Sequence, residues 1–125
     1  MLSNRMAVAT LAVRDLPAAK RFYENTLGLK QIGSEGEEVA VYATGGSRLA
    51  VYRSQFAGTN QATACTWNLG ADIDKVVGEL KSKGVTFEHY DMPGMKREGD
   101  IHVAGGTRAA WFKDPDGNIH SLVNR

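Results

Sequence analysis

The sequence predicts an α+β protein built from two βαβββ modules, whose strands form a curled mixed sheet with the helices outside. Three observations lead to this fold class. A strand pattern, a helix cap and a closing glycine follow one another early in the chain, the same succession recurs later, and the tail has the signature of a β-hairpin. With 125 residues, of which 42% are hydrophobic and 23% charged, the chain is long enough for a modest core.

The first module is expected over about residues 1–58. Residues 9–13 alternate between the two faces of a strand. Asp15 is a predicted N-cap for a helix that runs to Leu27, and Gly28 is placed to end it. Three further strands are expected, near residues 30–34, 37–44 and 48–53.

The second module, expected over about residues 62–125, repeats these signals. Residues 65–69 alternate as a strand, Asp72 caps the next predicted helix and Gly84 ends it. The two caps lie 57 residues apart and the two closing glycines 56 residues apart, which favours an internal repeat over chance. Later strands are expected from residue 85, over 100–104 and on both sides of the final hairpin.

The tail is the most specific local signal. Segment 114–117 (Asp-Pro-Asp-Gly) has the residues of a type I turn with a left-handed glycine, which predicts a three-residue hairpin loop. With Asp114 opposite Asn118, Trp111 falls opposite Ser121, and the two side chains share one face of the sheet.

Strand alternation divides the predicted sheet into a helix face and an open face. Polar residues collect on the open face, as expected of a trough that binds a small molecule. The predicted ligand contacts on that face are Thr10, Tyr52, Asn68, Trp111 and Ser121. Trp111 offers a flat apolar surface and one N–H donor, and ligand contact and simple packing are equally compatible with its position.

Four other residues invite a chemical interpretation. His102, in the predicted strand 100–104, is a weak candidate for a general base because no acidic partner is identifiable in the sequence. His120 and Trp67 alternate onto the helix face and are expected in the core. Cys65 is expected to be a buried, inert thiol. Residues 90–99 are expected to form a loop over the trough.

Bulk composition restricts the partners. The net charge is +1 with no basic stripe, which argues against nucleic-acid binding. No apolar run is long enough to span a membrane, and a single cysteine fits a reducing, cytoplasmic environment.

Four motifs taken in order resemble the vicinal oxygen chelate superfamily, which includes glyoxalase I, bleomycin-resistance proteins and extradiol dioxygenases. They are segments 13–16 (Val-Arg-Asp-Leu), 22–23 (Phe-Tyr), 27–29 (Leu-Gly-Leu) and 114–118 (Asp-Pro-Asp-Gly-Asn). The resemblance covers essentially the whole chain. It implies paired βαβββ modules and a homodimer.

The resemblance also assigns four metal-ligand positions, which are Val8, Ala50, either Ala64 or Cys65, and Ser121. These residues do not supply the three or so ligands that a catalytic metal needs, so we expect no metal cofactor. The resemblance then implies a protein that binds or sequesters a small apolar or aromatic molecule. Two alternatives stay open: an enzyme (lyase, isomerase or dioxygenase) that uses a divalent metal or a His102 base at non-standard positions, and an interaction module whose trough is filled.

Overall fold

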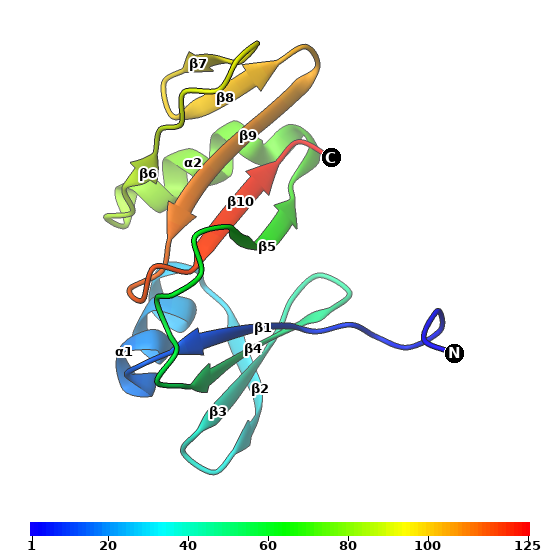
Figure 1. Cartoon of the computed structure of the whole chain (residues 1–125), viewed down its shortest axis with the longest axis vertical. Helices are drawn as coiled ribbons and strands as arrows, with labels where there is room; N and C mark the ends of the chain where they lie inside the picture. Colours follow the sequence, from blue (N-terminus) through cyan, green and yellow to red (C-terminus); the bar gives the residue numbers. More distant parts are fainter. The chain divides into compact units, whose positions relative to one another are not determined.

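The protein divides into two compact units, Met1–Asn60 and Gln61–Arg125 (Figure 1). Both units come from a computed structural model that describes residues 1–125. Each unit contains one mixed sheet and one principal helix, which confirms the expected α+β class. No helix is long and apolar enough to cross a membrane.

The first unit has the predicted βαβββ order. Its parallel pair β1–β4 continues through antiparallel pairs, so the sheet order is β1-β4-β3-β2. The elements are β1 (Ala9–Val13), α1 (Leu16–Arg21), the π-helical turn η1 (Phe22–Thr26), β2 (Lys30–Glu35), β3 (Val39–Ala43) and β4 (Arg48–Arg53).

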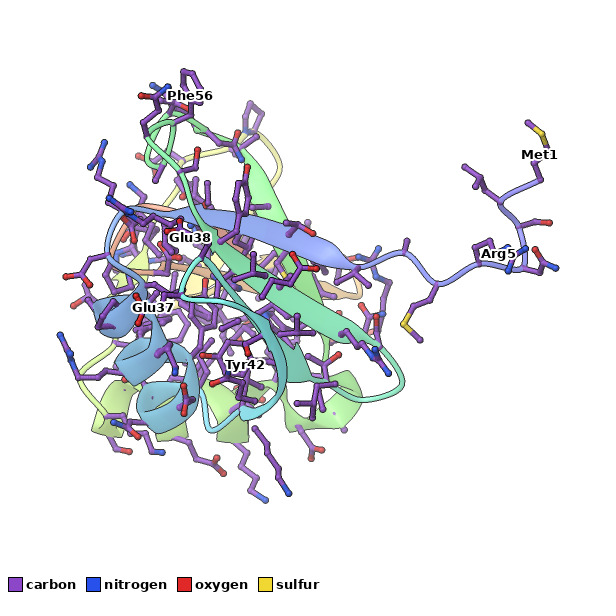
Figure 2. All side chains as sticks on the ribbon, turned by 90° about the horizontal axis from the view of Figure 1, so that it is seen from below. Met1, Arg5, Glu37, Glu38, Tyr42 and Phe56 are labelled. Atoms are coloured by element: carbon purple, nitrogen blue, oxygen red, sulfur yellow. The ribbon has the colours of Figure 1, made fainter.

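The first helix begins as predicted but changes from α-helical to π-helical geometry half-way. The Asp15 carboxylate accepts a hydrogen bond from the Ala18 amide at 3.1 Å, which confirms the N-cap. From Phe22 the backbone continues as η1, and Gly28 then takes a φ of 73°, which suits a residue without a Cβ. Tyr42 packs against Tyr23 in the core of this unit and donates its hydroxyl to Glu24 at 2.9 Å (Figure 2).

The second unit also contains a parallel pair, β5–β10, and its main sheet order is β5-β10-β9-β8-β7. The helix α2 lies across one face of this sheet (Figure 1). The elements are β5 (Thr63–Asn68), the 3-10 turn η2 (Gly70–Asp72), α2 (Ile73–Ser82), β6 (Phe87–Glu88), β7 (Lys96–Glu98), β8 (Ile101–Ala104), β9 (Thr107–Lys113) and β10 (Ile119–Val123).

One edge of the second sheet differs from the expectation. The predicted loop 90–99 contains the strand β7, and the strand expected from residue 85 is only β6, Phe87–Glu88. Both β6 and β8 pair with the same seven-residue strand β9. The chain therefore leaves the sheet after Glu88, forms the β7 excursion and returns at Ile101.

The expected single curled sheet is replaced by two open sheets. Each ladder of hydrogen bonds ends at edge strands, which are β1 and β2 in the first unit and β5 and β7 in the second. The edge position of β5 also corrects the burial predicted for Cys65 and Trp67. An edge strand is covered on fewer sides, so both side chains are only half-buried.

The hairpin register is confirmed in full. The Asp114 and Asn118 backbones pair at 3.0 Å, Gly117 has a φ of 87°, and Trp111 lies opposite Ser121. The buried Asp114 carboxylate holds the turn: it accepts the Asp116 and Asn118 amides at 2.9 and 2.8 Å and the Asn118 side-chain amide at 2.8 Å. The turn therefore fixes which side chains β9 and β10 present to each face.

Candidate functional site

The second sheet carries a compact aromatic cluster on the face away from α2. Trp111 on β9 is half-buried, and its ring stands edge-on to two neighbours. The ring centroids of Trp111 and His102 are 4.9 Å apart at 80°, and those of Trp111 and Tyr90 are 5.4 Å apart at 77°. Such edge-to-face contacts are favourable and fix the orientation of each ring. We call His89, Tyr90, His102 and Trp111 the aromatic cluster.

The ladder explains why these residues meet. His102 on β8 pairs with Ala109, which is two residues before Trp111 on β9, so both aromatic side chains point to one face. Ser121 lies opposite Trp111 on the same face and is 5% exposed. Asn68 at the end of β5 pairs with Val123, on the same face as Ser121. Three of the predicted contacts therefore share the surface that carries the cluster.

A charged network borders the cluster where the chain leaves the sheet. The Asp100 carboxylate contacts His89 Nε2 and Lys81 Nζ, each at 2.7 Å. A hydrogen bond from Lys81, which has the largest effect, and a second one from His89 hold the pKa of Asp100 below its usual range. The network ties both ends of the β7 excursion to the last turn of α2. His89 also lies against His102, with ring centroids 6.4 Å apart.

Sequence reasoning missed Tyr90, His89 and Asp100. Tyr90 was expected in the loop 90–99 over the trough, and no partner was predicted for His89. Their proximity arises because β6 and β8 both border β9, so positions eleven residues apart meet at the break between them. The alternation of residues in the sequence does not indicate where the chain leaves the sheet between β6 and β8.

The buried histidine His120 belongs to the core, as predicted. Its Nδ1 accepts a hydrogen bond from Trp67 Nε1 at 3.0 Å, and its ring stacks on Phe112 with centroids 4.8 Å apart. Burial lowers the pKa of His120 to about 4, so the ring is neutral near pH 7. Both the hydrogen bond and the stacking leave this histidine in a structural role.

The remaining predicted contacts lie on the sheet of the first unit. Thr10 pairs with Ala50 and Ala12 pairs with Tyr52, so Thr10 and Tyr52 share one face. Tyr52 is 38% exposed and Thr10 is exposed as well.

A groove of about 580 Å³ lies elsewhere in the first unit, near the start of α1 and the turn between β2 and β3. Its charged lining residues are Arg14, Asp15, Lys20, Glu37, Glu38 and Arg53. Glu37 and Glu38 are marked in Figure 2, and Arg53 contacts Glu38 at 3.5 Å. None of the predicted ligand contacts lines this groove, which carries equal numbers of acidic and basic groups.

Comparison with protein families decides the relationship of the chain. Residues 5–120 match the sequence model of the Glyoxalase/Bleomycin resistance protein/Dioxygenase superfamily. The chain belongs to this superfamily. The resemblance inferred from the four sequence motifs is thereby confirmed.

Solved structures of the superfamily share the fold over nearly the whole chain. A bleomycin resistance determinant encoded on the transposon Tn5 is 21% identical, with a TM-score of 0.75 and 98% coverage of both chains. A superfamily member from Sphaerobacter thermophilus is 26% identical, with a TM-score of 0.69 and 98% coverage of both chains. A lactoylglutathione lyase from Agrobacterium tumefaciens is 18% identical, with a TM-score of 0.70 and coverage of 98% of this chain and 95% of that one. A comparison with curated protein sequences finds no significant match.

The residues at the four positions assigned to metal ligands do not fit a divalent metal. Val8, Ala50 and Ala64 have no donor atom in their side chains, and Ser121 offers only a neutral hydroxyl. Burial raises the pKa of the Cys65 thiol, which disfavours the thiolate that binds metals. No group of three or more His, Cys, Asp or Glu side chains in residues 1–125 is placed to hold a metal ion.

Proposed function

We propose that this superfamily member binds, and in doing so sequesters, a small apolar or aromatic molecule without a metal cofactor. The observation that supports the proposal is the aromatic cluster, in which two edge-on neighbours hold the half-buried ring of Trp111. A ring fixed before binding loses little conformational entropy when a planar ligand stacks on it. Ser121 and Asn68 are proposed as polar contacts on the same face, and Thr10 and Tyr52 are proposed as ligand contacts on the sheet of the first unit.

The donor chemistry at the four assigned positions also supports binding rather than metal catalysis, because the side chains there are apolar or neutral. The bleomycin resistance determinant shares the fold at 21% identity, which agrees with the proposal but carries no ligand over to this chain. We further propose that the protein is a homodimer, as the resemblance implies. Light scattering coupled to size exclusion should then give twice the mass of one chain.

The two tryptophans of the chain make a sharp test. The variant Trp67→Phe retains only Trp111 as a fluorescent tryptophan, and Trp111→Phe retains only Trp67. Titration with bleomycin and with planar two-ring compounds such as coumarin should change the emission of Trp67→Phe and leave that of Trp111→Phe nearly constant. An equal change in both variants would contradict binding at the cluster.

A thermal-shift screen of the unmodified protein tests binding independently of fluorescence. A ligand at 100 times its dissociation constant stabilises the folded state by about 2.7 kcal/mol. Absence of any shift across a broad panel of metabolites and antibiotics would favour the interaction module instead.

The second candidate function is an enzyme of the same fold. It is supported by the His89–Asp100 pair at 2.7 Å, an arrangement that orients an imidazole for proton transfer. His102 is less suited to act as a base, because its Nε2 lone pair accepts the Tyr90 amide at 2.9 Å. Near-stoichiometric zinc, nickel, iron or manganese in protein purified without chelators would overturn the metal-free proposal in favour of a metalloenzyme.

A further inference from the structure

His102 is the most unusual group of the aromatic cluster. It is 1% exposed, yet it contacts no charged group at ion-pair distance and forms one hydrogen bond, from the Tyr90 amide to Nε2 at 2.9 Å. Its second ring nitrogen, Nδ1, is buried and has no hydrogen-bond partner. Buried polar atoms without a partner are rare in folded proteins and call for an explanation.

The hydrogen bond to Nε2 determines where the proton of the ring lies. A neutral imidazole has one nitrogen that donates and one that accepts. Because Nε2 accepts from a backbone amide, which can only donate, the proton lies on Nδ1. A second proton on Nε2 would point at the Tyr90 N–H and break this hydrogen bond. His102 is therefore a neutral ring that presents an unused N–H donor at Nδ1.

His120 shows the opposite arrangement in the same unit. There Nδ1 accepts from Trp67 Nε1, so the proton of the neutral ring lies on Nε2. The two buried histidines are thus expected in different tautomeric forms, which gives an internal reference for measurement.

The surroundings of His102 select the kind of acceptor. Its ring lies against Trp111 and Tyr90, and its two partners in the ladder are Ala109 on β9 and the exposed Arg97 on β7. The Nδ1–H group is an uncharged donor, so it needs an acceptor and no counter-ion. A carbonyl oxygen is such an acceptor.

We propose that the ligand is a planar carbonyl compound, such as a lactone, lactam or quinone, whose carbonyl oxygen accepts a hydrogen bond from His102 Nδ1–H. The planar part lies against Trp111. The inference rests on the proposed function, since it names the class of molecule that the cluster binds. His102 is then a specificity-determining donor and not a general base.

The test compares coumarin, which carries a ring carbonyl, with naphthalene, which has a similar two-ring outline and no acceptor. By isothermal titration calorimetry, the unmodified protein should bind coumarin about tenfold more tightly than naphthalene, as one hydrogen bond to a buried donor gives. His102→Phe should reduce this ratio to about one while naphthalene affinity stays within about threefold. The matched control His120→Phe replaces the other buried histidine, which lies outside the cluster, and should keep the ratio.

Long-range ¹H–¹⁵N spectra of the imidazole groups test the proposal in unmodified protein, whether or not His102→Phe folds. Before addition of ligand, His102 should carry its proton on Nδ1 and His120 on Nε2, and coumarin should shift the His102 Nδ1 signal. A proton on Nε2 of His102, or equal affinity for coumarin and naphthalene, overturns the inference and leaves the proposed function intact. If neither coumarin nor naphthalene binds, and no member of the metabolite and antibiotic panel binds, the inference and the proposed function are both overturned.

Discussion

Acidification should destabilise the protein through His120. This ring is buried against Phe112 and accepts the Trp67 indole N–H, and burial lowers its pKa from 6.5 to about 4. In the unfolded chain the same ring titrates at its ordinary value. Between these two values the unfolded state binds a proton that the folded state does not, so the free energy of unfolding falls as the pH falls. The contribution is complete above pH 6.5 and is lost on acidification towards pH 4.

The two pKa values set the size of the effect. From pH 7 to pH 4.5 the unfolded chain gains about three quarters of a proton at this site and the folded chain about one quarter, and the integrated difference is a loss of about 2 kcal/mol. Neither Trp67 nor Phe112 titrates in this range. Cys65, which pairs with His120 across the ladder, has its pKa raised by burial and stays a neutral thiol.

Urea unfolding at pH 7.0 and pH 4.5 measures the effect in the unmodified protein, in His120→Gln and in the control His89→Gln. His120→Gln will be less stable at pH 7, but its midpoint should change with pH by about 1 M less than that of the unmodified protein. The control replaces an exposed histidine and should keep most of the pH dependence. Equal pH dependence in the unmodified protein and His120→Gln would refute the reasoning.

Three further predictions concern the turn and the charged network. Asp114→Ala removes three hydrogen bonds from the buried turn and should lower the free energy of unfolding by about 3 kcal/mol in urea unfolding, whereas the exposed Asp91→Ala should change it by less than about 0.5 kcal/mol. Gly117→Ala introduces a Cβ at a φ of 87° and should cost about 1 kcal/mol by thermal unfolding, unlike Gly106→Ala, where φ is not positive; equal costs would contradict a conformational cause. The pKa of Asp100 is lowered by its partners, so its contribution is present above about pH 4 and lost below; Asp100→Asn should flatten the acid limb of a stability–pH profile, and an unchanged limb would argue against the network.

Local signals in the sequence predicted the elements of the fold well. Asp15 caps its helix, Gly28 and Gly84 follow the two helices with positive φ, and the hairpin pairs Trp111 with Ser121. Each of these features depends on residues within a few positions of one another. Such short-range preferences are visible in sequence because the backbone conformation and the side-chain hydrogen bond arise together.

The predictions that failed depend on neighbours distant in sequence. Cys65 and Trp67 alternate as expected, but their strand lies at a sheet edge and is only partly covered. Residues 90–99 were expected as a loop, although Lys96–Glu98 pairs with β8. Alternation reports which face a side chain occupies and not how many strands or helices cover it.

The sequence by itself determined the α+β class, the hairpin register and the family, because turn and alternation signals are local and recur in both halves of the chain. The predicted caps did not both hold: Asp15 accepts a hydrogen bond from the first turn of its helix, whereas the Asp72 side chain makes no cap hydrogen bond. Only the tertiary structure decided the surroundings of His102. Its partners come from a backbone amide twelve residues away and from a tryptophan on the next strand, brought together because β6 and β8 border the same strand. The sequence supplied the imidazole and the indole, and the ladder determined which ring nitrogen was left with a proton to donate.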